Sequence, residues 1–366
     1  MKKTLLFLTV GAMALTACTS EEDTPMSLRT DTPEAISFRA GMGTRADEVT
    51  NANISDFYVT ALYNDSTLFD KVNFVKGSDN YFESSHNYYW PGETDSVSNM
   101  VKFYAYYPSE DALGADITLT NSRKVMENFS PAENIADQVD FITANTQGVR
   151  AQYEKTGVPL TFDHRLAQIE VRAKSDDTDY TYTVTGVRIG RAEYLANFDF
   201  STNTWTLDDW HDRICYDASC SPIVLGSEAV SIMGDGGNAM LLPQTLTAWD
   251  NAPHHDPDNV ARGSYLSVLV RIESKAGAVV YPFASDKKLD SNGQPRKYAW
   301  TAVPISGTWE QGKKYIYTLD FTNGAGTTDP DEPVPGVPVL GDPLKFTVKV
   351  NDWIDTPSNE SMKPNL

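Results

Sequence analysis

Long apolar segments are scarce in this chain, and the one at its start is short. It runs from Leu5 to Leu15 and follows Lys2 and Lys3. A run of this length is too short to span a membrane as a helix and is typical of the apolar part of a secretory signal peptide. No second run of this kind follows in the sequence, so we expect the mature chain to hold to a membrane only through attached lipid.

Positive charge is also in the minority. The chain carries 30 Lys and Arg residues against 50 Asp and Glu residues, which gives a net charge of −20. Such an acidic surface repels nucleic acid and anionic lipid headgroups, so we expect no nucleic-acid partner.

The chain has 366 residues, of which 40% are hydrophobic and 11% are aromatic. These are enough to form two domains with real cores.

Cysteine is nearly absent, with three residues in all, and the first of them follows the apolar segment. Leu15-Thr16-Ala17-Cys18 resembles the lipobox of bacterial lipoproteins, in which the cysteine is diacylated and becomes the new N-terminus. This resemblance implies a signal peptide over residues 1–17, lipid on Cys18 and a flexible tether over residues 18–35. The alternative is an ordinary signal peptide with a chance cysteine. The acidic residues 21–23 resemble the signal that sends such lipoproteins to the cell surface.

The other two cysteines, Cys215 and Cys220, are separated by four residues. In the oxidising compartment that a signal peptide implies, this spacing predicts a disulfide that closes a short loop. Two reduced thiols on neighbouring strands are the alternative. A structural zinc site is not favoured, because it normally needs four ligands and no second pair accompanies these cysteines.

Helical periodicity is almost absent, whereas apolar and polar residues alternate in many short segments. Such alternation predicts β-strands with one buried face, and the clearest segments are residues 101–107, 167–174, 266–273, 315–321 and 344–350. A short helix is predicted after Ser130, where a capping-box spacing and a proline occur together, followed by a strand over residues 139–144. Short strands between Gly, Asn, Asp and Pro turns predict an all-β fold of two β-sandwiches.

The division into domains follows from length and composition. We expect an N-terminal sandwich over residues 36–157 and a C-terminal sandwich over residues 158–323, with an error of about ten residues at their boundary. Residues 324–343 are rich in Gly, Pro, Asp and Thr. They are predicted to form an extended arm with too little apolar surface to pack. The final strand and tail, residues 344–366, must then find a sheet edge in this subunit or in another one.

Motifs typical of enzymes are missing. The sequence has no nucleophile elbow, phosphate loop, His-Glu-x-x-His pair or dinucleotide fingerprint. Asp163 and His164 are neighbours on a predicted strand, so their side chains point to opposite faces and cannot form a catalytic pair. His254 and His255 lie in a polar loop, and residues 235–238 lack the ligand spacing of a calcium loop and predict a turn. We therefore expect no catalytic site, no metal site and no cofactor.

Several segments together are similar to the fimbrillin-like (Mfa-like) proteins of Bacteroidales. The most specific is Pro159–Ile169, which contains the Phe-x-His-x-Leu-Ala-x-Ile pattern of a strand in that family. Residues 103–108, 139–144, 312–317 and 348–353 also look similar to strands of the family. The order and spacing of these matches cover nearly all of the mature chain, so the protein is identified by resemblance as a member of this family.

The resemblance implies two transthyretin-like β-sandwich domains and a role as a subunit or adhesin of a surface pilus at the outer membrane. In that family the subunits travel as lipoproteins, and a trypsin-like protease then cuts after an arginine and removes the lipid and the first strand. A strand from the next subunit fills the vacated groove. Arg45 resembles the cleavage site and follows a strand-like segment, residues 35–40; Arg29 and Arg39 are competing sites. An ordinary exposed arginine is the alternative for Arg45.

The sequence leaves the role within the pilus open between stalk subunit, tip adhesin and anchor. Phe346, Val348 and Val350 form the apolar face of a candidate donor strand, or of the last strand of the second sandwich. A tip protein would bind a glycan or a protein through exposed loops, and the aromatic region of residues 205–210 is a candidate. The alternative function is a surface glycan-binding lipoprotein of a nutrient-uptake system, with a carbohydrate-active enzyme as a weaker one.

Overall fold

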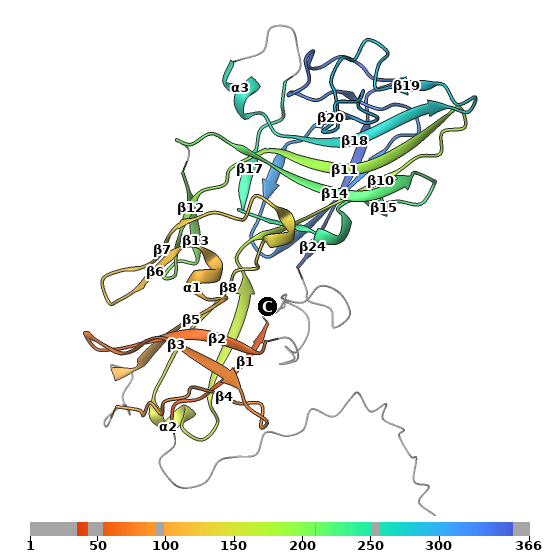
Figure 1. Ribbon diagram of the computed structural model, residues 1–366. Coiled ribbons are helices and arrows are strands. Elements are labelled where there is room, and N and C mark those ends of the chain that lie inside the picture. Colours follow the sequence, from red (N-terminus) through yellow and green to blue (C-terminus); the bar gives the residue numbers. More distant parts are fainter. Residues whose placement is uncertain (1–34, 43–53, 92–98, 209, 251–256, 354–366) are drawn as a thin grey trace, which may run out of the picture.

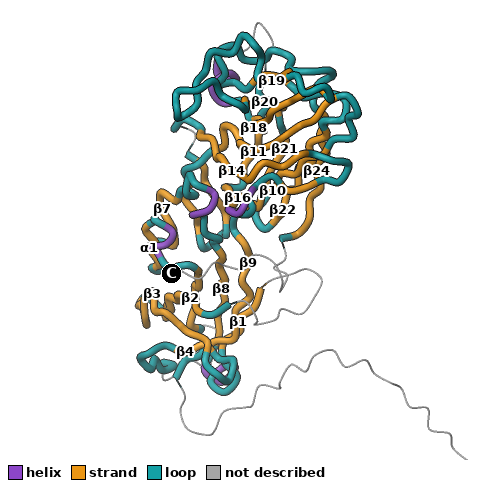
Figure 2. Tube along the Cα trace, turned by 45° about the vertical axis from the view of Figure 1, so that its right-hand side comes forward, coloured by secondary structure: helices purple, strands orange, loops and turns teal. Residues whose placement is uncertain are grey.

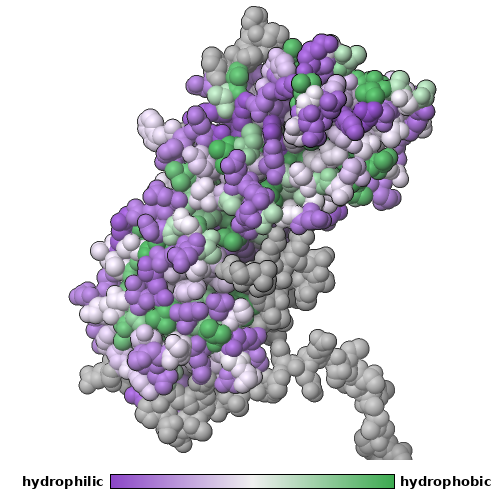
Figure 3. Space-filling model, viewed as in Figure 1, coloured by the Kyte–Doolittle hydropathy of each residue, from purple (hydrophilic) through white to green (hydrophobic). Residues whose placement is uncertain are grey.

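The computed structural model describes residues 35–42, 54–91, 99–208, 210–250 and 257–353. Strands dominate this part of the chain and form two lobes that follow each other along one long axis (Figures 1 and 2). The prediction of an all-β fold is therefore confirmed. Figure 3 shows hydrophilic residues over most of the visible face, with small hydrophobic patches between them.

The first lobe is a closed barrel of strands. Its order is β1 (Phe38–Met42), β4 (Phe82–Glu83), β3 (Ser66–Lys76), β2 (Asp56–Tyr63), β5 (Val101–Tyr107), β8 (Ile142–Gly148) and β9 (Val158–His164), and β9 pairs with β1. Alternate side chains of each strand point inward, as in β5, where Val101 and Phe103 are buried and Lys102 is exposed. The inward side chains, many of them phenylalanines, form one core.

A four-stranded sheet lies between the lobes and combines segments from both halves of the sequence. Its order is β13 (Thr204–Leu207), β12 (Ala196–Asp199), β7 (Lys124–Phe129) and β6 (Asp116–Leu119). Phe129, Phe198 and Trp353 pack in its core together with Tyr106 of the barrel. Strands from both sides of the predicted boundary at residue 157 are therefore hydrogen-bonded neighbours.

Two further sheets enclose the core of the second lobe. The first has the order β15 (Val230–Ser231), β10 (Ala167–Lys174), β22 (Lys313–Asp320) and β24 (Lys345–Asp352), with β16 (Ala239–Leu241) also on β10. The second has the order β14 (Ile214–Val224), β11 (Tyr180–Ala192), β18 (Tyr265–Ser274), β20 (Ala299–Pro304) and β23 (Thr327–Thr328), with β19 (Val279–Tyr281) also on β18. A small separate sheet pairs β17 (Gln244–Leu246) with β21 (Gly307–Trp309).

The described helices are short: α1 (Glu110–Leu113), α2 (Arg150–Tyr153) and α3 (Pro257–Arg262). None of the helices in the described ranges has the length and apolar character needed to cross a membrane. The helix predicted after Ser130 is instead a 3₁₀ turn, η2 (Ile135–Asp137), at whose start the Asn134 side chain accepts a hydrogen bond from the Ala136 amide. The strand predicted from residue 139 begins at Ile142. The turn predicted over residues 235–238 overlaps a further 3₁₀ turn, η3 (Gly234–Gly236).

β9 still belongs to the barrel, so the chain passes to the second lobe after His164, within ten residues of the boundary expected at residue 157. One predicted segment differs from the structure. Residues 324–343 do not form an extended arm, because bridges between Thr327 and Pro338 and between Gly324 and Gly341 fold the segment back on itself. Ala325 and Val339 of this segment pack in the core of the second lobe, and the buried Asp329 contacts Ser267 of β18. As a result, β24 returns to the side of β22 in its own subunit.

Candidate assembly site

β1 lies in the core of the first lobe although it is the first strand of the described chain. Its inward side chains and those just before it are nearly inaccessible: Ile36 is 2% exposed, Phe38 0%, Ala40 3% and Met42 8%. The Phe38 ring contacts three other rings edge-on, with centroid distances of 4.7 Å to Phe74, 5.3 Å to Phe103 and 6.0 Å to Phe57. This strand therefore fills a groove that the other strands of the barrel form.

The pairing of β1 is uneven on its two sides. Five residues pair with β9 in a parallel ladder, from Phe38 opposite Val158 to Met42 opposite Phe162. On the other side a single pair, Phe38 opposite Phe82, joins β1 to β4. Much of one edge of β1 thus lacks ladder hydrogen bonds to its neighbour β4, and the ladder to β9 and the burial of its side chains hold it in place.

The predicted processing residues lie around this strand in the sequence. Cys18, Arg29 and Arg45 fall outside the described residues, Arg45 within the segment 43–53 that links β1 to β2. Arg39 lies inside β1, so a cut after it would divide the strand. A cut after Arg45 would leave β1 whole and would leave it attached to the rest of the barrel only by non-covalent contacts.

β24, which carries the candidate donor residues, pairs with β22 over its full length, from Lys345 opposite Asp320 to Asp352 opposite Lys313. It is an edge strand (Figure 2). Val348 and Val350 stand opposite Tyr317 and Tyr315 and so share their core-facing side of the sheet. The tyrosines are buried, whereas Val348 is 41% and Val350 is 52% exposed.

Phe346 is the exception on this strand, because it is half-buried and its ring centroid lies 6.1 Å from that of Tyr317. The structure therefore pairs the last strand with its own sheet, one of the two arrangements that the sequence left open. Two of its three apolar residues nevertheless stay largely uncovered within the described part of the chain.

The end of β24 is fixed at the junction between the lobes. The Trp353 ring stacks on His164 with a centroid distance of 4.0 Å and an angle of 5° between the planes. The Trp353 amide donates to the carbonyl of Gly312 at 2.9 Å. His164 Nδ1 lies 2.6 Å from a carboxylate oxygen of Asp140, so the imidazole is oriented by a residue outside its own strand.

The Phe-x-His-x-Leu segment is structural in this arrangement. Asp163 does not orient His164; its carboxylate accepts a hydrogen bond from Arg165 at 3.3 Å. Arg165 Nε also donates to Thr143 Oγ1 at 2.7 Å, and burial lowers the pKa of Arg165. The sequence did not identify Trp353 as the partner of His164, although both residues lie in family-like segments.

The predicted disulfide between Cys215 and Cys220 is wrong, because both cysteines are free in the structure. They lie on the same strand, β14, not on neighbouring strands. Five steps of about 3.3 Å along an extended strand separate their Cα atoms by much more than the roughly 4.4–6.8 Å that a disulfide spans. Burial raises the pKa of the Cys220 thiol, which keeps it protonated at neutral pH.

Several buried carboxylates in the second lobe take part in ion pairs. Glu170 lies 2.5 Å from Arg172 Nε and 2.9 Å from Lys314 Nζ. Burial alone raises the pKa of Glu170, but the hydrogen bonds from these two cations outweigh it and lower the pKa below its usual value. An acid held in this way is ionised at neutral pH and joins β10 to β22, and it is not poised to donate a proton.

The chain is similar to several solved structures of bacterial proteins. A proposed cell adhesion protein from Bacteroides uniformis is 17% identical, with a TM-score of 0.47 and coverage of 89% of this chain and 100% of that one. The fimbrial anchor protein Mfa2 from Porphyromonas gingivalis is 11% identical, with a TM-score of 0.35 and coverage of 88% and 98%. The tip fimbrial protein Mfa3 from the same organism is 12% identical, with a TM-score of 0.33 and coverage of 87% and 98%.

All three TM-scores lie below 0.5, so these structures decide nothing about function. No curated protein matches the chain. The model of the fimbrillin-like family matches residues 44–353, which include the barrel strands from β2 onward, the sheet between the lobes, both sheets of the second lobe and Trp353. The chain belongs to the fimbrillin-like family.

Proposed function

We propose that this protein is a non-enzymatic subunit or adhesin of a surface pilus, exported as a lipoprotein through Cys18 and assembled by strand exchange after a cut at Arg45. The observation that supports it best is the position of β1. It is a buried strand, it has few hydrogen bonds to β4, and it directly precedes the segment that contains Arg45.

Loss of β1 would have a clear energetic consequence. Each large apolar side chain that leaves a core costs about 1.5–3 kcal/mol, and Ile36, Phe38 and Met42 would all leave. The exposed groove, lined by Phe57, Phe74 and Phe103, would be a strong acceptor for another extended segment with alternating apolar side chains. Main-chain hydrogen bonds to β9 and pockets for alternate side chains then provide the affinity.

β24 is the candidate donor for the groove of a neighbouring subunit. It is extended, it lies at a sheet edge, and its valines are poorly covered where they are. Transfer of Val348 and Val350 into a groove such as the one that β1 fills would bury apolar surface that the isolated subunit leaves in water. The partners are therefore further pilus subunits, at a cell-surface location.

The test is replacement of Arg45 by alanine in the cell that makes the pilus. The Arg45→Ala protein is expected to stay lipidated and to keep the residues before position 46. It is also expected to form no SDS-resistant oligomers, which appear as a ladder of bands on a gel. Arg39→Ala is the matched control, because it removes the neighbouring arginine, and it is expected to be processed normally to begin at Ala46. Filaments of Arg45→Ala that begin at Ala46, or unprocessed wild-type filaments, would refute the processing scheme.

A second function, glycan binding by a surface lipoprotein, is favoured by one observation. Trp210 precedes β14 and is 95% exposed, as a side chain that stacks on a sugar would be. Binding of a polysaccharide by the monomer, with no filaments on the cell surface, would favour this function. Turnover of the polysaccharide would favour a carbohydrate-active enzyme.

A further inference from the structure

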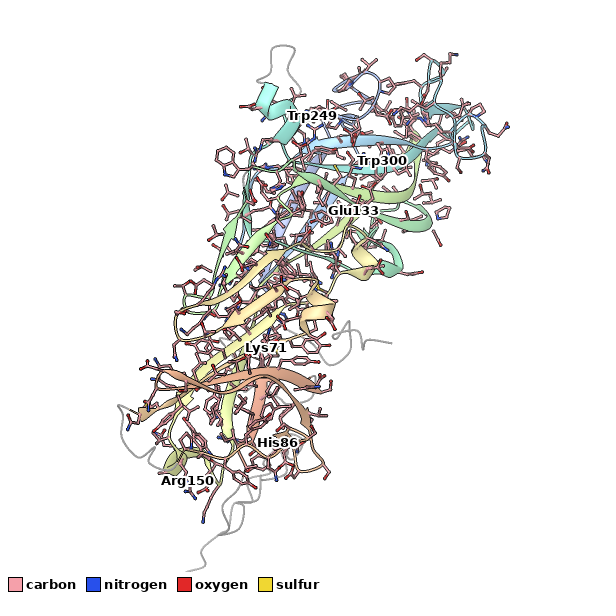
Figure 4. The ribbon with its side chains drawn as sticks, turned by 60° about the vertical axis from the view of Figure 1, so that its left-hand side comes forward. Lys71, His86, Glu133, Arg150, Trp249 and Trp300 are labelled. Carbon is pink, nitrogen blue, oxygen red and sulfur yellow. The ribbon has the colours of Figure 1, made fainter. Side chains whose placement is uncertain are left out.

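A cavity of about 520 Å³ opens in the second lobe, between two loops. One loop links β19 to β20, and the other is residues 329–337. Tyr281 lines the cavity, and its hydroxyl donates a hydrogen bond to the carbonyl of Trp300 at 2.6 Å. The cavity therefore lies close to Trp300. Figure 4 shows Trp300 in the second lobe, far from His86 and Arg150 in the first. The cavity is therefore remote from β1, and its size is within the roughly 300–1,000 Å³ of ligand sites.

The two loops are held to each other by a network of ion pairs. Arg296 donates to both oxygens of Glu332, at 2.6 and 2.8 Å, and also to Asp286. Lys288 Nζ lies 3.0 Å from Glu332 as well, and the Glu332 side chain is only 3% exposed. Since these ion pairs join the two loops to each other, the walls are preorganised, and binding would cost little loop ordering.

One wall of the cavity is apolar and incompletely covered. Phe283 is half-buried, and Val334 at the neighbouring loop is 63% exposed. Pro333 and Val337 extend the same wall. A ligand with an apolar ring face would remove this surface from water, with a favourable change in free energy.

The charge of the lining is opposite in sign to that of the whole chain. It contains three cations, Lys287, Lys288 and Arg296, against the two carboxylates of Asp286 and Glu332, whereas the chain as a whole carries −20. Arg296 and Lys288 are both used by those carboxylates. Lys287 is exposed and has no hydrogen bond or ion pair within the described ranges. It is the cation available for an external anion.

We propose that this cavity binds an acidic sugar residue, with the ring of the sugar against Phe283 and Val334 and its carboxylate on Lys287. A planar carboxylate accepts a charge-assisted hydrogen bond from a free ammonium group, and the apolar wall suits the C–H face of a pyranose ring. The proposal rests on the adhesive function proposed above and gives it a ligand class, at a place in the second lobe that strand exchange at β1 leaves free.

The test is calorimetric titration of the purified full chain with N-acetylneuraminic acid, glucuronic acid and glucose. We expect at least one of the two acids to bind at least about tenfold more tightly than glucose, and its binding to weaken as salt is added. Lys287→Ala is expected to weaken binding of that acid about tenfold, and Lys287→Arg to restore it. Val334→Asp, which places an anion in the wall, is expected to abolish it.

Lys275→Ala is the matched control, because Lys275 is also exposed and lies in the same lobe outside the cavity. It is expected to bind the acid as the wild type does. Equal affinity for the acids and glucose, absence of binding, or an unchanged affinity in Lys287→Ala would overturn the proposal. Filament formation by the same variants is scored separately, so a chain that assembles but binds no acidic sugar refutes the site and leaves the pilus function standing.

Discussion

Trp353 and His164 are separated by most of the second half of the sequence, yet their rings are stacked. The contact places the residue after β24 on the last residue of β9, and a carboxylate oxygen of Asp140 holds Nδ1 of the imidazole. A single aromatic pair thus links the end of the barrel to the end of the last strand. Its loss is expected to weaken the junction between the lobes.

Trp353→Ala removes a ring that is only 7% exposed, and we expect it to lower the free energy of unfolding by about 3 kcal/mol. Trp210→Ala is the matched control. Its ring is 95% exposed, so the expected change is within about 0.5 kcal/mol. Urea unfolding followed by circular dichroism measures both. Similar losses in the two variants would contradict the role given to Trp353.

The lipidation of Cys18 can be tested by replacing its sulfur atom with oxygen. Cys18→Ser is expected to abolish labelling with a radioactive fatty acid and to move the precursor out of the membrane fraction, because a hydroxyl does not replace the thiol that is acylated. Cys220→Ser is the control, since Cys220 is one of the two free cysteines of β14 and should not affect lipidation. Unchanged labelling of Cys18→Ser would rule out the lipoprotein assignment.

Among the elements, β24 has full backbone pairing to its neighbour, but part of its apolar face is not covered by the core. Its backbone is paired with β22 along its whole length, but Val348 and Val350 are exposed where Tyr315 and Tyr317 beside them are buried. Leu344 and Trp353, on either side of the strand, are buried. Truncation from Leu344 would therefore remove core residues as well as the strand, and it cannot separate the two roles. Substitution of the exposed valines can.

Replacement of both Val348 and Val350 by lysine is expected to leave the thermal midpoint of the monomer within a few degrees, because these side chains are 41% and 52% exposed. The same change is expected to abolish the SDS-resistant ladder, since two charges would have to enter a neighbour's core. Val224→Lys, on the edge strand β14 and 64% exposed, should affect neither. A ladder that persists in the double variant would mean that β24 is not the donor.

Over the whole molecule, acidic charge and buried ion pairs act on stability in the acid range. Burial alone raises the pKa of Glu332, but hydrogen bonds from Arg296 and Lys288 outweigh it and lower the pKa below the usual 4.5. The stabilisation from this pair is complete above about pH 4.5 and is lost as the pH falls through the lowered folded value. Burial raises the pKa of Asp329, so its ionisation lowers the stability of the fold as the pH rises. Because the two carboxylates act in opposite directions, a single Glu332 variant is more informative than the pH dependence of wild-type stability.

Glu332→Gln leaves Arg296 and Lys288 without their shared carboxylate, and we expect it to cost about 3 kcal/mol at pH 7. The difference from wild type should shrink below pH 4.5, where Glu332 itself becomes protonated. Glu228→Gln, at an exposed residue, should change stability little at any pH. Thermal melts between pH 3 and pH 7 measure the difference, and a loss that is constant over this range would contradict the ion-pair explanation.

Much of the strand content could be predicted from local patterns. Alternation identified β5, β10, β18, β22 and β24 to within a few residues, because the two-residue period of a strand is visible in any short window. The prediction for residues 324–343 failed, since the core contacts of Ala325 and Val339 and the contact of Asp329 with Ser267 join residues far apart in the sequence. The cysteine pairing failed because short separation along a chain is not proximity when the chain is extended.

The sequence by itself determined the all-β class, the family and the absence of the enzyme motifs considered, because each depends on residues close together along the chain. Only the tertiary structure decided that β1 closes a barrel between β4 and β9, that β24 returns to its own sheet, and that Lys287 lies at a preformed cavity. These features depend on pairings between distant segments. Such pairings are selected by the packing of the whole core rather than by any local preference.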